Sequence, residues 1–354
     1  MKVLIVDDSV VYRSAIKAAL SASDQSYDLD IAANGKIAVD KIKSKSFDIV
    51  TLDLEMPIMD GIETIKAIRE FDKQIPVIIF SAQNMSAANK TLHALELGAN
   101  DFVKKIEGSS DMESNINMIQ QELLPRFKAL TRKAVSHKTV NEVPEKPKKQ
   151  TLDSTPMTLN QLAQFKPNLI CIASSTGGPD ALKKIFAGLE KLPVPILLVQ
   201  HMPPVFTTQL AKGLDQISKI EVREAKIGDQ LQPGVAYLAP GDFHMVIKKS
   251  AHGYEIDLNQ DPKVCYVRPA ADVTFESVAS VFSGKVAGVV LTGMGSDGAN
   301  GSVALKEKGA RMMIQDEDSS VVWGMPKAVL DKGAQDICLS PSEMINLLNR
   351  MTLG

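Results

Sequence analysis

Three side chains that together could carry out acyl transfer each follow an apolar run in the second half of the chain. Ser175 follows ICIAS, His201 follows PILLVQ, and Asp297 lies in TGMGSDG after AGVVL. A serine hydroxyl becomes a useful nucleophile when an imidazole takes its proton, and the imidazole needs an acid to fix its tautomer. These residue types predict a serine hydrolase if the fold brings the three run ends together.

Each of these residues also has a structural interpretation. Ser175, with Gly177 and Gly178 after it, has the pattern of a hydroxyl helix cap at a glycine turn. It equally has the pattern of a nucleophile projected above a sheet by a sharp strand-to-helix turn. For the base, His201 and His244 are both candidates, and His201 is favoured because the run before it is the more continuously apolar.

The glycine-rich segment has a rival interpretation. Gly293, Gly295 and Gly298 fit G-x-G-x-x-G, and acids follow about twenty residues later at 316–318, as in a dinucleotide-binding oxidoreductase. Asp297 lies inside this loop, where it would repel a pyrophosphate. We therefore interpret Asp297 as an orienting acid kept ionised by the following helix end, with free amides of the GMG turn available to an oxyanion.

The first half of the chain contains a set of residues that suits a different chemistry. Asp7 and Asp8 end the run KVLIV, Asp53 ends FDIVTL, Ser81 ends PVIIF, and Lys105 ends NDFVK. Parallel strands present such run ends at one sheet edge. Three carboxylates there would repel one another unless a hard cation such as Mg²⁺ lay among them. One carboxylate could then accept a phosphoryl group.

The elements that must position these residues form two α/β patterns. In the first, short β-branched runs alternate with amphipathic stretches, which predicts a five-stranded doubly wound sheet; its strands are Lys2–Val6, Leu29–Ala32, Ile49–Leu52, Val77–Phe80 and Asp101–Val103. Residues 125–165 include a polar stretch rich in lysine and proline, which predicts a flexible linker. The βα rhythm then returns, with strand-like runs NLICIAS, PILLVQ, VAYLAP, AGVVLTG and RMMIQ and a hairpin inserted over HMVIKKSAHGYEIDLNQ. We predict domains at 1–124 and 166–354 around a 125–165 linker.

Composition limits the class of protein. The formal charge of −2 and pI of about 6.3 give no broad basic surface for nucleic acid. The three cysteines are widely spaced and odd in number, which favours a reduced cytoplasmic compartment over a disulfide framework. Asp7 and Asp8 interrupt the N-terminal apolar run, which is therefore neither a signal peptide nor a membrane span.

The first 124 residues resemble a response-regulator receiver domain. The resemblance implies that Asp53 is the phosphoacceptor and that Asp7 and Asp8 are Mg²⁺ ligands. It also implies that Ser81 is the hydroxyl switch, Phe102 the aromatic switch and Lys105 the phosphate-sensing lysine. The proline that usually follows this lysine is replaced by Ile106.

The motifs SSTGG, QHMPP, APGDFHM, RPAADVTF and LTGMGSDG resemble the catalytic domain of the chemotaxis response-regulator protein-glutamate methylesterase family. The resemblance implies Ser175 as nucleophile, His201 as general base and acid, Asp297 as orienting acid and the Met294 amide as oxyanion donor. Thr176 is implied as a polar neighbour of the site. The family's G-A-S-T-G-G begins here with Ala173, which implies backbone that does not need glycine.

The expected protein is thus a phosphorylation-activated serine esterase that hydrolyses glutamate methyl esters on chemotaxis receptors, deamidates glutamines, and receives its phosphoryl group from a histidine kinase. Its receiver is expected to cover part of the catalytic cleft until Asp53 is phosphorylated. Two other classes stay open at this point. One is the oxidoreductase indicated by the glycine motif, and the other is a receiver scaffold without catalysis.

Overall fold

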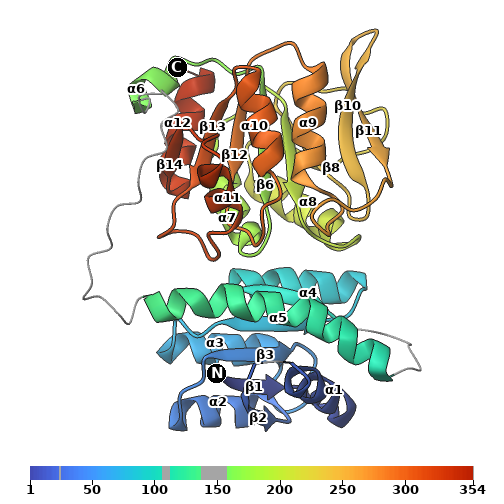
Figure 1. The fold of residues 1–354 in the computed structure, drawn as a ribbon, viewed down its shortest axis with the longest axis vertical. Coiled ribbons are helices and arrows are strands. Elements are labelled where there is room, and N and C mark those ends of the chain that lie inside the picture. Colours follow the sequence, from blue (N-terminus) through green and yellow to red (C-terminus); the bar gives the residue numbers. More distant parts are fainter. Residues whose placement is uncertain (24, 106–111, 137–157, 354) are drawn as a thin grey trace. The chain divides into compact units, whose positions relative to one another are not determined.

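The computed structural model describes residues 1–23, 25–105, 112–136 and 158–353. The chain divides into two compact units, Met1–Pro144 and Glu145–Gly354 (Figure 1). Both units are built on parallel sheets with helices between the strands, so the predicted α/β class is confirmed. None of the described helices combines the length and hydropathy that crossing a bilayer requires.

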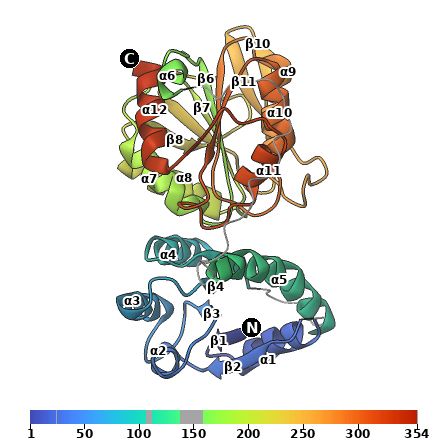
Figure 2. The same cartoon turned by 60° about the vertical axis from the view of Figure 1, so that its left-hand side comes forward.

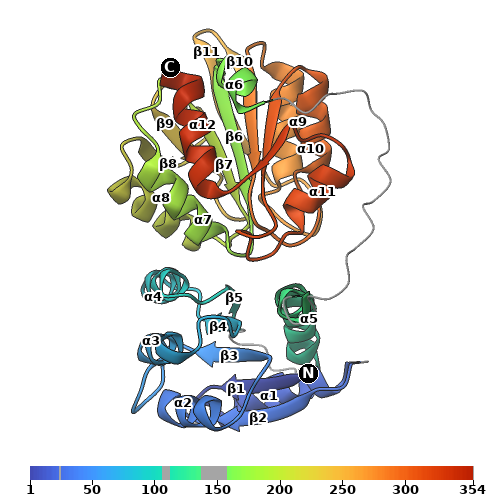
Figure 3. The ribbon, with the colours of Figure 1, turned by 90° about the vertical axis from the view of Figure 1, so that its left-hand side faces the viewer.

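The first unit alternates strands with helices around a five-stranded sheet of order β2-β1-β3-β4-β5, parallel throughout. Its elements are β1 (Lys2–Val6), α1 (Val10–Ser21), β2 (Asp28–Ala32), α2 (Gly35–Ser44), β3 (Ile49–Asp53), α3 (Gly61–Phe71), β4 (Val77–Ser81), α4 (Met85–Glu96), β5 (Asp101–Lys104) and α5 (Met112–Ser136). Helices α1 and α5 cover one face and α2, α3 and α4 the other (Figure 3). Because both faces are covered, β3 and β4 are buried at every residue.

The predicted start of the linker at residue 125 differs from the structure. Pro125 lies inside α5, which continues to Ser136. A proline usually ends a helix because it lacks an N–H group and crowds the preceding turn. Here Leu123, Phe127 and Leu130 are buried and α5 packs against α1, so tertiary contacts hold the helix past the proline. The rest of the predicted linker before α6 (Leu159–Ala163) falls largely on 137–157, outside the described residues.

The second unit contains a seven-stranded parallel sheet of order β14-β13-β12-β6-β7-β9-β8 and a separate antiparallel hairpin. After α6, its elements are β6 (Leu169–Ser174), α7 (Gly178–Gly188), β7 (Ile196–Gln200), α8 (Phe206–Ile217), β8 (Glu221–Glu224), β9 (Val235–Leu238), β10 (His244–Ser250), β11 (Gly253–Asn259), α9 (Ala271–Val281), β12 (Val286–Val290), α10 (Ala299–Glu307), β13 (Arg311–Gln315), α11 (Met325–Asp331), β14 (Ile337–Leu339) and α12 (Pro341–Leu353). The predicted hairpin is confirmed as β10–β11.

Helices α7, α8 and α12 lie on one side of this sheet and α9, α10 and α11 on the other (Figure 2). The central strands β12, β6 and β7 are buried at every residue. From β6 the chain moves outward to β7, and after the hairpin it returns on the opposite side at β12. The carboxyl end of β6 is therefore the point where strand order reverses, which is where open α/β sheets form their sites.

Candidate active site

The turn after β6 exposes Ser175 and buries Ser174. Ser174 is fully buried, and its Oγ donates a 2.6 Å hydrogen bond to Oε1 of Gln200. Ser175 is half-buried, and its backbone N donates to the Thr292 carbonyl at 3.0 Å, which ties the turn to the end of β12. The Ser174 hydroxyl is committed to structure, so Ser175 is the hydroxyl available to a substrate.

Two glycines let this turn form. Gly177 has a φ of +76°, and a Cβ there would lie 2.5 Å from Cβ of Val321. A Cβ on Gly178 would lie 2.1 Å from Oε1 of Gln200. Both contacts are far inside van der Waals distance, so α7 can begin this close to the strand ends only with glycine at 177 and 178. Ala173 lies within β6 in register with Val290 and Val199, so this position needs no glycine.

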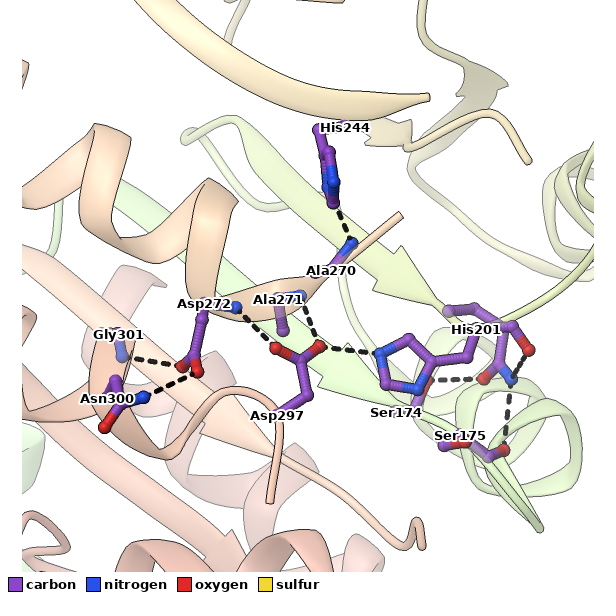
Figure 4. Close-up of polar contacts among 11 residues, drawn as sticks. Ser174, Ser175, His201, His244, Ala270, Ala271, Asp272, Asp297, Asn300 and Gly301 are labelled. Carbon is purple, nitrogen blue, oxygen red and sulfur yellow. Dashed lines mark hydrogen bonds and ion pairs between the residues drawn. The ribbon is translucent and has the colours of Figure 1, made fainter. Parts of the chain in front are cut away.

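His201 follows β7, the next strand in the sheet, and its backbone N donates to the Ser174 carbonyl at 3.2 Å. Its Nε2 lies 2.7 Å from Oδ2 of Asp297. Figure 4 shows the imidazole between Asp297 and Ser175. With the acid accepting the Nε2 proton, neutral His201 leaves Nδ1 unprotonated and able to accept the serine proton. The Ser175 hydroxyl makes no hydrogen bond to the described residues, so that last contact is not formed in this structure.

Asp297 is almost fully buried, and its carboxylate accepts hydrogen bonds from three donors. Besides His201, it accepts hydrogen bonds from the backbone amides of Ala271 (2.5 Å) and Asp272 (3.0 Å) (Figure 4). Burial alone would raise the pKa of Asp297, but the hydrogen bond and charge of His201 and the two amides outweigh it and hold the pKa below its usual range. The carboxylate is therefore kept ionised, as an orienting acid requires.

The predicted source of this stabilisation was wrong in one respect. The sequence suggested the helix that follows the glycine-rich loop, which is α10, whereas the amides that bind Asp297 belong to the first turn of α9. Helix α9 begins at Ala271, and its N-cap Ala270 has no side chain that can cap it. The acid of a distant loop fills that role, which spacing along the chain could not show.

The proposed oxyanion donor lies in the same loop. A Cβ on Gly293 would lie 2.9 Å from Cβ of Ser175, so the GMG backbone passes directly beside the serine. The Gly293 amide donates to Val322 and its carbonyl accepts from Gly324. The Met294 amide donates to no group among the described residues, which leaves it available to a substrate oxygen.

Sequence reasoning did not single out Gln200, although it lies in the QHMPP motif. Its Nε2 donates to the carbonyls of Ser175 (3.0 Å) and His201 (3.3 Å), while its Oε1 accepts from Ser174. The buried side-chain amide of Gln200 therefore fixes both the turn after β6 and the turn after β7. The signal available was its position: a polar residue that ends a strand otherwise made only of apolar residues. Thr176 is also buried, and its carbonyl accepts from Oγ1 of Thr292 at 2.9 Å.

The rival base, His244, lies apart from the serine. It is fully buried at the start of β10, its Nδ1 accepts from the Ala270 amide at 3.2 Å, and its Nε2 lies 3.2 Å from the Pro262 carbonyl. Both ring nitrogens are used in holding backbone, so this histidine supports the start of α9 (Figure 4).

In the first unit the predicted acids converge at the carboxyl edge of the sheet. Oxygen atoms of Asp7, Asp8 and Asp53 lie within 4.8 Å of one another. Nζ of Lys105 lies 2.7 Å from Oδ2 of Asp53 and 3.1 Å from Oδ2 of Asp7. The latter oxygen is buried without a hydrogen bond of normal geometry. An all-oxygen set in which this buried oxygen is held only by the ion pair with Lys105 fits Mg²⁺.

Burial raises the pKa of Asp53, more than the hydrogen bond and charge of Lys105 lower it. Asp53 and Lys105 line a cavity of about 170 Å³ together with Ser81. The hydroxyl of Ser81 accepts from Oγ1 of Thr91 at 2.6 Å, while Phe102 is buried in β5. The predicted acceptor, hydroxyl and lysine therefore share one cavity, and Ile106 lies outside the described residues.

Comparison with known proteins identifies the family. The CheB methylesterase family matches residues 170–348, and the response regulator receiver domain family matches residues 3–117. The chain belongs to the CheB methylesterase family.

Its relatives match over nearly the whole length. A protein-glutamate methylesterase/protein-glutamine glutaminase of Trichodesmium erythraeum (strain IMS101) is 42% identical, with 95% of this chain and 94% of the relative covered. One from Pyrococcus horikoshii is 39% identical, with 95% and 89% covered. The crystal structure of the Thermotoga maritima CheB methylesterase catalytic domain is 39% identical, with a TM-score of 0.51, over 53% of this chain and all of that one. The predicted family of this chain is confirmed.

Proposed function

We propose that this chain is a serine esterase that hydrolyses glutamate methyl esters on chemotaxis receptors, and that phosphorylation of Asp53 activates it. The observation that carries the proposal is the arrangement at the carboxyl ends of β12, β6 and β7, where Ser175 lies beside a histidine already hydrogen-bonded to a buried, ionised aspartate. The named activity of the relatives supports the choice of substrate.

The residues divide the chemistry as follows. The Ser175 Oγ attacks the ester carbonyl while His201 Nδ1 takes its proton, and the Met294 amide stabilises the negative oxygen. His201 then gives that proton to the departing methoxide, so that methanol leaves and the glutamyl group stays on Ser175. Water, losing a proton to His201, cleaves this acyl-enzyme and releases glutamate and the serine. A glutamine side chain would follow the same route and release ammonia.

Asp7, Asp8 and Asp53 would hold Mg²⁺ in the receiver domain, where the ion would offset the charge of the incoming phosphoryl group. Asp53 would accept that group from a chemotaxis histidine kinase. Lys105, now paired with Asp53 and Asp7, and the Ser81 hydroxyl would then bind its oxygens, which repacks the receiver face around Phe102. We propose that the unphosphorylated receiver restrains the esterase.

A methylated chemoreceptor fragment tests the activity. The native chain is expected to release methanol and leave glutamate, which mass spectrometry of the fragment detects as loss of the methyl groups. Ser175→Ala serves as the inactive control. Methyl release at the same rate in both chains, or in neither, would refute the assignment of Ser175 as the nucleophile of a methylesterase.

A further inference from the structure

The motif RPAADVTF has a part in the site that the triad does not account for. Helices α9 and α10 both begin without a side chain cap of their own, because their N-cap residues are Ala270 and Gly298. Each helix is instead capped by an aspartate from the other segment. Asp297, just ahead of α10, binds the first amides of α9, and Asp272, in the first turn of α9, binds the first turn of α10 (Figure 4).

The cap that Asp272 provides to α10 consists of two hydrogen bonds. Oδ1 of Asp272 accepts from the Gly301 amide at 2.7 Å, and Oδ2 accepts from Nδ2 of Asn300 at 3.2 Å. The Asp272 side chain is buried, with a relative exposure of 2%. A Cβ on Gly301 would lie 2.5 Å from Cβ of Phe275, so the two helices approach each other more closely than a side chain at 301 would permit.

These bonds secure one end of the loop that carries catalytic groups. Its other end is fixed at Gly293, whose amide binds Val322 and whose carbonyl accepts from Gly324 and Met325. Between the two ends lie the Met294 amide and the Asp297 carboxylate, both of which must hold their positions relative to Ser175.

We propose that Asp272 is a positioning residue of the esterase, which holds the Gly293–Gly298 loop in register by capping α10, and so aligns Asp297 with His201. This inference rests on the proposed function. Alignment of this kind affects turnover more than binding, because displacement of a reacting geometry by about 1 Å can cost about 100-fold in rate.

Electrostatics favours a functional role over a purely structural one. Burial, together with the neighbouring charges of Asp297 and Glu276, raises the pKa of Asp272 to about 6 in spite of the Gly301 and Asn300 hydrogen bonds. The Cys265 thiol also faces the two carboxylates. Two buried carboxylates so close together oppose each other, and a neutral cap would avoid that cost. A charged residue retained at a cost to stability is typical of active sites.

Three variants of the full chain test the proposal, with the methylated receptor fragment as substrate. Asp272→Ala removes both acceptors, and kcat is expected to fall about 10- to 100-fold while KM stays within about twofold. Asp272→Asn keeps an acceptor for Gly301 but makes weaker, uncharged hydrogen bonds, so kcat should fall less, about three- to tenfold. Glu276→Gln is the matched control: it removes an exposed carboxylate of the same helix that caps nothing, and its kcat should be native.

A second readout needs no substrate. In histidine-labelled protein, the proton on His201 Nε2 reports the bond to Asp297 by NMR, with His201→Ala identifying the signal. This signal should broaden or move upfield in Asp272→Ala and stay in place in Glu276→Gln. A general loss of packing would instead alter the signals of all five histidines.

The outcomes separate the two hypotheses. A folded Asp272→Ala chain with native kcat and an unchanged His201 signal overturns the positioning role, and so does a rise in KM alone. If Asp272→Ala does not fold, native kcat in Asp272→Asn overturns it. If the native chain shows no Ser175-dependent methyl release, the proposed function fails, while the NMR comparison still decides whether Asp272 aligns His201 and Asp297.

Discussion

Each of the two parallel sheets has a buried aspartate at or just beyond its carboxyl edge, and the surroundings shift the pKa values of these two aspartates in opposite directions. Asp53 is 4% exposed and Asp297 2% exposed. Burial dominates at Asp53 and raises its pKa in spite of Lys105. At Asp297 the same effect is outweighed by His201 and two helix amides, and the pKa is lowered.

The difference is the one that the proposed roles of the two carboxylates would require. A phosphoacceptor needs oxygens left available for a metal ion and a phosphoryl group, so the surrounding protein supplies few fixed donors. An orienting acid has to stay ionised in one position, so its oxygens are bound on several sides. The carboxyl edge of a parallel sheet can support either kind of site, because the loops and helix ends around that edge differ between the two units.

The largest effect expected concerns the serine. Ser175→Ala should reduce methyl release by several orders of magnitude, since only oxyanion stabilisation and binding remain. Ser174→Ala should be far milder, because its hydroxyl serves only Gln200. Turnover measurements on both variants check this, and equal losses would show that the assigned register of the turn is wrong.

Next in size are the variants of the base and its acid. His201→Ala and Asp297→Asn should each lower kcat by about 10³-fold or more, and adding Ser175→Ala to either should cost little further. His244→Ala tests the alternative base, with circular dichroism to confirm the fold. An inactive, folded His244→Ala chain together with an active His201→Ala chain would contradict the triad.

The sequence predicted the parts of the molecule that depend on local pattern. Apolar runs located the strands of both central sheets, and residues at their ends located Ser175, His201, Asp297 and the acids of the receiver. The outer strands β8 and β14 were missed. Edge strands have one neighbour. EVRE contains a single apolar residue, and ICL is apolar but, at three residues, too short to show a strand pattern.

Long-range contacts also escaped prediction. Asp297 caps α9 by accepting from the amides of Ala271 and Asp272, which lie 26 and 25 residues earlier in the sequence. Nothing in the sequence of the Asp297 loop indicates these partners. Gln200 and Asp272 were missed for the same reason, since each acts by binding backbone of another segment. The predicted linker begins inside α5, because the buried side chains of Leu123, Phe127 and Leu130 hold this helix beyond Pro125.

A smaller effect is expected from removing the receiver. Deleting residues 1–150 should raise basal methyl release severalfold if the receiver restrains the esterase. The Thermotoga maritima catalytic domain, whose crystal structure contains that domain without a receiver, supports the expectation that the remaining part folds. A truncated enzyme no faster than the full chain would exclude restraint and leave only direct stimulation by the phosphorylated receiver.

The smallest effect is on stability. Because the pKa of Asp272 is raised to about 6, the folded state binds more protons than the unfolded state between about pH 4 and 6. Stability from this group is therefore present at low pH and lost as the pH rises through 6. Relative to Asp272→Asn, the native chain should lose about 1–2 kcal/mol over this range, less than the full shift because solvent screens part of it. Denaturant titrations at several pH values measure the difference, and a constant difference would contradict the burial of a charged carboxylate.

The central claim is that phosphorylation of Asp53 controls hydrolysis at Ser175. Methyl release from a methylated receptor fragment is measured with the full chain before and after adding a small acyl phosphate and Mg²⁺, with phosphorylation followed by intact mass. We predict a higher rate in the native chain, no increase in Asp53→Asn, which keeps its basal rate, and no release in Ser175→Ala. A native chain that is phosphorylated at Asp53 yet releases methanol at its basal rate would contradict the account.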